Sequence, residues 1–452
     1  MQHLKTCLLT ACAAIATSFC HAQGWINVGT PGFSDSAVNF ASMTIDRNGV
    51  PYVAYQEAGS GPVGPATAMK FNGTSWVNVG NPRFSVGGAL CVSLTTDTGG
   101  TPYIAYVDLT NDDKVNVMKY NGSTWVSVGI PDFSHGIALN TAVAIDKNGI
   151  PYVGFQYAIP AVMKFNDTNW VNVDSAGMPI IIANSISIAI DSAASPYLAF
   201  TDQNNGNKAS VIHYTGSAWA FLGSEDFSAG GADFLNIVID SSGTPYIAYS
   251  DGTNDDKASV MKFNGTNWVY VGSPDFSAGE ADGLTIVLVA GIPYVVYSDV
   301  PAGFKITVKK FNGTNWVTVG NTGVTVAAGG GAGMVVGPDE IPYIYFADNL
   351  HGQRITVMKM DTATAGIKNT SSPTSSLTIF PNPTHNTFTL NISTPQPETA
   401  TITITNILGE KVKEFKATTS ADTQVTLDAP AGIYFVTGVT SGSTQTEKVE
   451  VY

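Results

Sequence analysis

Short apolar runs separated by polar turn residues recur along most of this chain. The clearest copy runs from Ile239 to Gly272 and contains no stretch with helical periodicity. Within it, Tyr246 and Ala248 alternate with Ile247 and Tyr249 along one predicted strand, so both faces of that strand are apolar. A sheet with two apolar faces needs cover on both sides, which neighbouring sheets can provide.

Each copy of the pattern predicts four strands. The first ends in an apolar residue followed by aspartate, as at Ile239-Asp240, and a turn with glycine and proline follows it. The second begins at a Pro-Tyr pair, and the third reads Val-Met-Lys-Phe or a variant of it. An Asn-Gly turn, a strong signal for a hairpin, then leads into the fourth strand, Trp-Val-x-Val-Gly.

Two markers fix the period of this repeat at 45 to 51 residues. All seven tryptophans occupy one position of the repeat: Trp25, Trp76, Trp125, Trp170, Trp219, Trp268 and Trp316. Seven Pro-Tyr pairs keep the same rhythm, beginning at Pro51, Pro102, Pro151, Pro196, Pro245, Pro293 and Pro342. Repeated four-stranded sheets of this length are typical of β-propeller blades.

The two ends of the repeat predict how the ring closes. Trp25 has no earlier strands of its own, whereas the last repeat has Pro342-Tyr343 but Ala365 where its tryptophan should fall. We therefore expect an all-β fold: a seven-bladed propeller closed by an N-terminal strand from Trp25 to Gly29. Closure removes the exposed strand edges that an open array would leave.

Composition and charge limit the possible binding partners of the protein, and its first residues indicate where it is sent. The chain has 452 residues, is 44% hydrophobic and 12% charged, and carries a formal net charge of -14. This acidity argues against nucleic acid and anionic membranes as partners. Residues 1–22 are predicted to form a signal peptide, because Lys5 precedes an apolar stretch and small residues stand before Gln23. No later segment is long and apolar enough to span a membrane. We expect the protein to be a monomer.

The propeller pattern, predicted over residues 23–364, is followed by a small, polar linker at 365–376 and by a different β-rich segment. Alternation such as Thr401-Ile402-Thr403-Ile404 is typical of strands. About seven short strands within residues 377–452 predict a small immunoglobulin-like sandwich.

This last segment closely resembles the type A C-terminal sorting domain of the type IX secretion system of Bacteroidota. The residues that carry the resemblance are a Phe-Pro-Asn-Pro opening, an Asn-x-x-Gly-x-x-Val hairpin and a Pro-Ala-Gly-Ile-Tyr-x-Val strand. They include Pro381, Asn382, Pro383, Gly409, Gly432 and Tyr434. The resemblance implies export through the periplasm and the outer membrane, with the secretion machinery as a partner, and release or attachment at the cell surface. The repeats also resemble secreted seven-bladed propellers, including lectins, but no binding motif matches.

Residues that recur in every blade are expected to be structural. We expect the tryptophans to pack between blades, and the Phe-Ser pairs that precede five blades (Phe33, Phe84, Phe133, Phe227 and Phe276) to pack in the core. The recurring aspartates after the first strand (Asp46, Asp97, Asp146, Asp191 and Asp240) are expected to hydrogen-bond the turn that follows.

The sequence shows no catalytic motif. There is no Gly-x-Ser-x-Gly elbow, no metal-ligand spacing and no sialidase box, so we assign no catalytic residue and no metal ligand. Paired carboxylates for glycoside hydrolysis remain open, because their separation is a three-dimensional quantity.

The candidates for ligand binding lie in loops between the second and third strands. They are Asp108, Asn111, Asp112, Asp113, Asp251, Asn254, Asp255 and Asp256. These loops should share one face of the ring with the Phe-Ser connections, because successive strands alternate in direction. Clustered Asp and Asn side chains can bind sugar hydroxyls or Ca²⁺, the one cofactor that the sequence suggests, whereas a solvated hairpin end is the plainer interpretation.

Three functional hypotheses follow for an exported propeller. The first is binding without catalysis, of a glycan or another cell-surface ligand, and the second is a hydrolase or lyase that acts on polysaccharide. The third is a structural or adhesive surface module. We favour the first, since repeated pockets give avidity and the sequence displays no asymmetric catalytic cluster.

Overall fold

A computed structural model describes residues 24–58, 63–157, 159–320, 323–325, 327–361, 376–394, 396–407, 409–440 and 444–452. The predicted signal peptide and the predicted linker up to residue 375 lie outside this range. The chain divides into two compact units, His21–Thr362 and Ala363–Tyr452. Among the described residues, no helix is long and apolar enough to cross a membrane.

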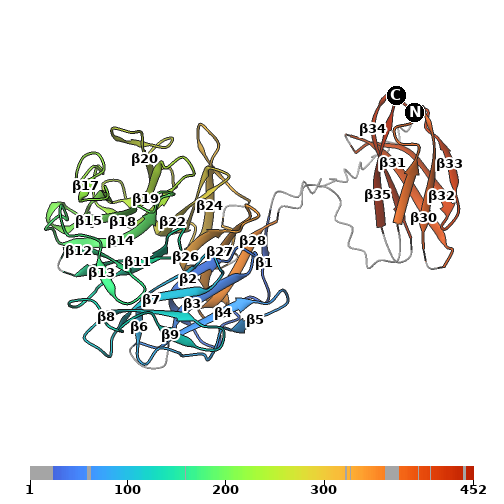
Figure 1. Ribbon diagram of the computed structural model, residues 1–452. Coiled ribbons are helices and arrows are strands. Elements are labelled where there is room, and N and C mark those ends of the chain that lie inside the picture. The colour runs from blue at the N-terminus through green and yellow to red at the C-terminus, as the bar shows by residue number, and fades with distance from the viewer. Residues whose placement is uncertain are drawn as a thin grey trace, which may run out of the picture. The chain divides into compact units, whose positions relative to one another are not determined.

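The first unit contains seven four-stranded antiparallel sheets arranged in a ring (Figure 1), which confirms the predicted seven-bladed propeller. Blade 1 has β2 (Val38–Ile45), β3 (Pro51–Glu57), β4 (Ala66–Phe71) and β5 (Trp76–Asn78); blade 2 has β6 (Ala89–Thr96), β7 (Pro102–Asp108), β8 (Lys114–Tyr120) and β9 (Trp125–Ser127); blade 3 has β10 (Thr141–Ile145), β11 (Pro151–Tyr157), β12 (Ile159–Phe165) and β13 (Trp170–Asn172). Blade 4 has β14 (Ala183–Ile190), β15 (Pro196–Asp202), β16 (Lys208–Tyr214) and β17 (Trp219–Phe221), with the short 3-10 helix η1 (Gln203–Asn205); blade 5 has β18 (Ala232–Ile239), β19 (Pro245–Asp251), β20 (Lys257–Phe263) and β21 (Trp268–Tyr270). Blade 6 has β22 (Ala281–Val289), β23 (Ile292–Asp299), β24 (Lys305–Phe311) and β25 (Trp316–Thr318); blade 7 has β26 (Gly329–Val336), β27 (Pro342–Asp348) and β28 (Arg354–Met360), with η2 (Asn349–His351).

Blade 7 takes its outer strand from the N-terminus. Strand β1 (Trp25–Asn27) pairs antiparallel with β28, with Trp25 opposite Met360 and Asn27 opposite Met358. The predicted closure of the ring is therefore confirmed, and β28 is paired on both sides, by β27 and by β1.

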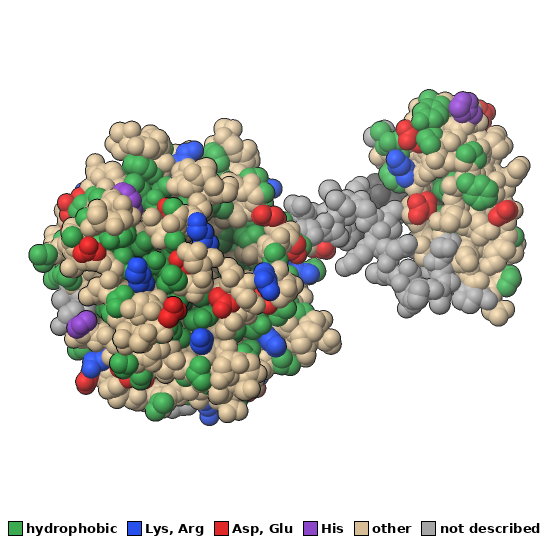
Figure 2. All heavy atoms as spheres, viewed as in Figure 1, with side chains coloured by type: hydrophobic (Ala, Val, Ile, Leu, Met, Phe, Trp, Pro, Cys, Tyr) green, Lys and Arg blue, Asp and Glu red, His purple; other side chains and the backbone are tan. Residues whose placement is uncertain are grey.

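The hydrophobic core of the propeller lies between the blades. One cluster joins Tyr103 and Val115 of blade 2 to Val153 and Phe155 of blade 3, and similar clusters link the other neighbours. Two-faced strands such as β7, in which every residue is buried, need this arrangement. Figure 2 shows one face of the propeller, with a hollow at its centre and hydrophobic side chains inside the hollow.

Strand direction defines two faces of the ring. The hairpin loops between second and third strands, together with the connections from one blade to the next, form what we call the loop face. The turns between first and second strands, and between third and fourth strands, form the turn face.

The second unit is a sandwich of two antiparallel sheets, as predicted. One sheet has the order β29-β30-β33 and the other β32-β31-β34-β35. The strands are β29 (Ser376–Phe380), β30 (Thr387–Ser393), β31 (Thr399–Asn406), β32 (Lys411–Thr418), β33 (Thr423–Thr426), β34 (Gly432–Val439) and β35 (Thr444–Val451). Its own core includes Phe388, Leu390, Ile402, Ile404 and Val436, all fully buried.

Candidate functional site

The recurring tryptophans join neighbouring blades. The Trp125 indole N–H donates a hydrogen bond of 2.8 Å to the Val79 carbonyl oxygen of the preceding blade. Six tryptophans make this bond at 2.7–2.8 Å, and Trp25 closes the set with a bond of 3.3 Å to Val319. The prediction that they pack between blades is confirmed, and these buried rings do not form an open platform for sugars.

The Phe-Ser pairs are also structural, as predicted. Phe84 stacks on Trp125 with ring centroids 4.5 Å apart, and the same stack recurs at Phe33, Phe133, Phe227 and Phe276. The adjacent Ser85 hydroxyl accepts from the Ala66 N–H and donates to the Gly87 carbonyl, which ties the connection to the blade before it. On the turn face, Asp46 Oδ1 accepts from the Asn48 and Val50 N–H groups, so the predicted turn role of these aspartates is confirmed.

On the loop face, Asp108 and Asp251 occupy the ends of their second strands. Both are buried, and each Oδ1 accepts hydrogen bonds from the N–H and the hydroxyl of the threonine two residues later, Thr110 or Thr253. One oxygen of each carboxylate is thus committed to shaping the hairpin.

Asn111 and Asn254 connect these hairpins to the segment that enters the next blade. The Asn254 side-chain amide donates to Asp275 Oδ2 at 2.9 Å, and Asn111 makes the same bond to Asp132. The predicted placement of the hairpin loops and the Phe-Ser connections on one face is therefore confirmed. The bond also brings a second acid, Asp132 or Asp275, beside the strand-end aspartate; sequence reasoning did not single out either acid.

The remaining candidates lie at the hairpin tips. Asp112 and Asp255 are exposed, and Asp113 and Asp256 are half-buried. All four adopt positive φ angles of 52–55°, a conformation that Asp and Asn tolerate better than most residues. Their side chains are accessible to a ligand. The positive φ angles are an equally good reason for aspartate at these positions.

Blade 2 differs from five of the other blades at one position of its third strand. Five blades have a hydroxyl residue there, and each hydroxyl donates to a nearby carboxylate: Thr67, Ser210, Ser259, Thr307 and Thr356. Blade 2 has Asn116, which is only 6% exposed. Asn116 Oδ1 and Asp132 Oδ1 are both buried and have no hydrogen-bond partner among the described residues. The sequence already contained this difference, because Asn116 stands where five other repeats have Ser or Thr.

These groups open into a pocket of about 310 Å³. Asp108, Asn116, Asp132 and Ser127 are among its polar lining residues, and Tyr106, Met118 and Val86 are among its apolar ones. Of the predicted candidates, the pocket gathers Asp108 and Asn111.

Burial raises the pKa of Asp132 above the ordinary value of 3.8; the hydrogen bond from Asn111 opposes this shift, and the charge of Asp108 adds to it. A raised pKa means that ionisation of this carboxyl is less favourable in the native state than in the unfolded state. The native state is therefore destabilised as the pH rises from the ordinary pKa through the raised one. We expect Asp132→Asn to raise the thermal unfolding midpoint at pH 7 and to give a smaller gain below pH 3.8. Asparagine tolerates the positive φ at this position.

Asp275→Asn is the matched control, because Asp275 holds the same place in blade 5 and already accepts hydrogen bonds from Asn254 and Ser259. Scanning calorimetry of both variants across this pH range checks the prediction. An equal gain for the two variants would contradict it.

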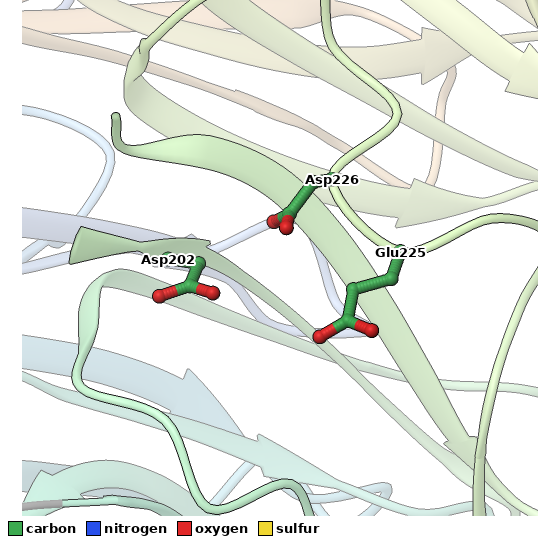
Figure 3. A group of neighbouring side chains, drawn as sticks. All are labelled: Asp202, Glu225 and Asp226. Carbon is green, nitrogen blue, oxygen red and sulfur yellow. The ribbon is translucent and has the colours of Figure 1, made fainter. Parts of the chain in front are cut away.

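Blade 4 groups three acids on the loop face. One carboxylate oxygen from each of Asp202, Glu225 and Asp226 lies within 4.8 Å of the others (Figure 3). Asp202 Oδ1 accepts from the Asn204 N–H, and Asp226 accepts from Asn205 and from the Ser210 hydroxyl. Part of the ligand capacity of Asp202 and Asp226 is thus already used within the protein, and three carboxylates alone fall short of the six to eight oxygen ligands that Ca²⁺ prefers.

Several of the six motif residues of the C-terminal unit take part in its turns and hydrogen bonds. The Asn382 side chain donates to the Lys448 carbonyl oxygen and accepts from the Glu450 N–H, which attaches the Pro381-to-Pro383 segment to β35. Gly409 takes a φ of 81° in the turn before β32. Gly432 begins β34, where the Tyr434 hydroxyl donates to the Pro430 carbonyl oxygen at 2.6 Å.

Comparison with known proteins supports the assignment of this unit. A family model described as the secretion system C-terminal sorting domain matches residues 378–451. No curated protein matches the sequence.

Several solved structures resemble the propeller. An α-L-arabinofuranosidase from Fusarium graminearum is 11% identical, with 75% of this chain and 97% of that chain covered and a TM-score of 0.44. A lectin from Aleuria aurantia is 12% identical, with 66% and 99% covered and a TM-score of 0.43. An ulvan lyase of polysaccharide lyase family 25 is 11% identical, with 74% and 93% covered and a TM-score of 0.46.

The match at residues 378–451 confirms the resemblance seen in the motif residues. The chain is a β-propeller protein that a type IX sorting domain directs to the cell surface or out of the cell.

Proposed function

We propose that the propeller binds a glycan, or another hydroxyl-rich surface ligand, in the blade 2 pocket and without catalysis. The observation that carries the proposal is the pair of buried acceptors, Asn116 Oδ1 and Asp132 Oδ1, for which the described part of the chain supplies no donor. A buried polar atom without a partner is unfavourable, and ligand hydroxyl groups supply the missing donors.

The rest of the pocket suits the same chemistry. Met118 and Val86 provide apolar surface for the carbon face of a sugar ring, beside the polar groups that would set its orientation. Blades 4 and 5 repeat the Asp-Asn-Asp arrangement through Asn205 and Asn254, so weaker copies of the site would add avidity on a repetitive polymer.

A glycan array probed with the full chain, with and without Ca²⁺, tests the proposal. We expect saturable binding that Asn116→Ser lowers by about tenfold to a hundredfold, because a serine would donate to Asp132 as Ser259 does to Asp275. Ser259→Asn makes the reciprocal change in blade 5 and is expected to leave the blade 2 affinity unchanged.

The hairpin tips are tested separately. Asp112→Asn with Asp113→Asn reports on the rim of the blade 2 pocket, and Asp255→Asn with Asp256→Asn is the same change in blade 5. Asparagine fits the positive φ at all four positions, so the fold is retained. Binding that survives Asn116→Ser but disappears with the tip variants would move the site to the loop tips. Silence across the array would favour the structural or adhesive hypothesis.

One observation favours a hydrolase as the second candidate. Asp132, whose pKa is raised mainly by burial, lines the same pocket as Asp108, and carboxylates held in different environments are typical of glycosidase acid and base pairs. Under this hypothesis the chain releases reducing ends from a bound glycan. Asp132→Asn and Asp108→Asn would then stop product release but keep binding, whereas the binding proposal expects no product from any variant.

A further inference from the structure

Blade 3 has the shortest hairpin on the loop face. Its strands β11 and β12 pair as far as Tyr157 and Ile159, with one residue between them. Pro151 and Trp170 are 19 residues apart, whereas the corresponding pair in blades 2, 4, 5 and 6 is 23 residues apart. Blade 3 therefore lacks four residues at the place where blades 2, 4 and 5 project a polar loop.

An apolar pocket of about 350 Å³ lies at this place. Phe155, Ile159, Pro160, Met178 and Ile180 are among its apolar lining residues, and His135 and Asp174 are among its polar ones. Where five other blades have Ser or Thr and blade 2 has Asn116, blade 3 has Ala161, which also lines the pocket. The blade thus replaces both the loop and the hydroxyl with apolar surface.

Exposed aliphatic side chains flank this pocket on both sides. Ile137 and Leu139, in the connection that enters blade 3, are 53% and 59% exposed. Ile180 and Ile182, in the connection that leaves it, are 88% and 47% exposed. An apolar patch of this kind on a soluble protein marks an interaction surface.

The surroundings of the patch are acidic. The loop face has 17 acidic and 6 basic side chains, a formal excess of 11 negative charges. This count covers the connections between blades and the hairpin loops, with one flanking strand residue at each end of each hairpin loop. On the turn face, acids such as Asp46 and Asp240 are offset by lysines near the ends of the third strands: Lys70, Lys119, Lys164, Lys262, Lys310 and Lys359. The negative charge of the propeller is therefore concentrated on the face that contains the pocket, and this face complements a positively charged partner.

We propose that the blade 3 pocket binds a large aromatic or aliphatic side chain of a cationic polypeptide. The pocket volume is near the lower end of the range for ligand sites, roughly 300–1,000 Å³, which suits one anchoring side chain. The flanking aliphatic residues exclude water around the anchor, and the acidic loops attract its basic neighbours. This site is separate from the glycan pocket of blade 2 and does not depend on it.

The probe is the blocked peptide acetyl-Lys-Trp-Lys-amide, titrated into the full chain by calorimetry or by chemical-shift perturbation. Acetyl-Lys-Ala-Lys-amide lacks the anchor, and acetyl-Glu-Trp-Glu-amide reverses the charge. We expect measurable binding of the first peptide and at least about tenfold weaker binding of the other two. Absence of binding of the tryptophan peptide, or equal binding of the alanine peptide, overturns the proposal.

The repeat itself supplies the decisive variant. Replacing residues 157–159 with the seven residues Asp251 to Lys257 restores the regular 23-residue spacing without changing the register of β11 and β12. The graft covers the pocket and is expected to abolish peptide binding while array binding through blade 2 persists. Ile180→Ser is the second variant, because a side chain that is 88% exposed contributes little to folding. This substitution should lower the affinity for the tryptophan peptide by about threefold or more. Unchanged peptide affinity in the folded graft also overturns the proposal.

Discussion

Trp125→Ala is expected to lower the unfolding free energy of the propeller by about 3–5 kcal/mol. Trp125 is 5% exposed, stacks on Phe84, and donates its indole N–H to Val79 of the preceding blade. Truncation removes the filling between two blades and leaves the Val79 carbonyl without this bond, so the cavity and the lost hydrogen bond act together.

Denaturant unfolding followed by tryptophan fluorescence measures this effect, and all seven tryptophans lie in the propeller, so the signal reports on that unit alone. Trp125→Phe keeps most of the volume and removes the donor, and we expect about 1–2 kcal/mol for it. Leu350→Ala, in η2 of blade 7 and 64% exposed, is the surface control, with an expected loss below about 1 kcal/mol. Equal losses for Trp125→Ala and Leu350→Ala would show that the indole does not join the blades.

Removal of residues 377–452 is expected to stop passage through the outer membrane and to leave the propeller in the periplasm. These residues include all seven strands of the sorting domain except the first residue of β29, with a core of their own. Cell fractionation in a host with a type IX system, with detection of the propeller in the periplasm, on the surface and in the medium, measures the outcome.

Two controls separate loss of sorting from loss of folding. Protease resistance of the retained propeller shows that the ring still forms without the C-terminal unit. A carrier protein fused to residues 377–452, behind a signal peptide, should in turn reach the outside. Surface or medium levels equal to those of the full chain would contradict a sorting role for this segment.

The architecture was accessible from the sequence because the repeat marks it at every level. Trp125 and its six counterparts set the blade count, Asn-Gly turns set the hairpins, and the unpaired Trp25 predicted the closing strand. The site was only partly accessible. Asp108 and Asn111 were predicted as candidates, but Asp132 comes from the next connection along the chain and meets them through a side-chain hydrogen bond that no local pattern specifies.

Departures from the repeat contain the rest of the information. Asn116 and the short spacing from Pro151 to Trp170 are visible in the sequence as irregularities. Whether an irregularity opens a pocket or is absorbed by packing depends on side-chain volumes around it, which periodicity does not encode.

The seam between β1 and β28 has a consequence for the order of events during folding. Trp25 pairs with Met360, 335 positions later, whereas Trp316 pairs with Phe311, only five positions earlier. Contacts so distant along the chain form late, because the entropy of closing the loop must be overcome before they contribute. The ring is therefore expected to pass through an open intermediate in which blades 1 to 6 are complete and β28 has an unpaired edge. A synthetic peptide with the sequence of β1 would compete for that edge during refolding and slow the last kinetic phase.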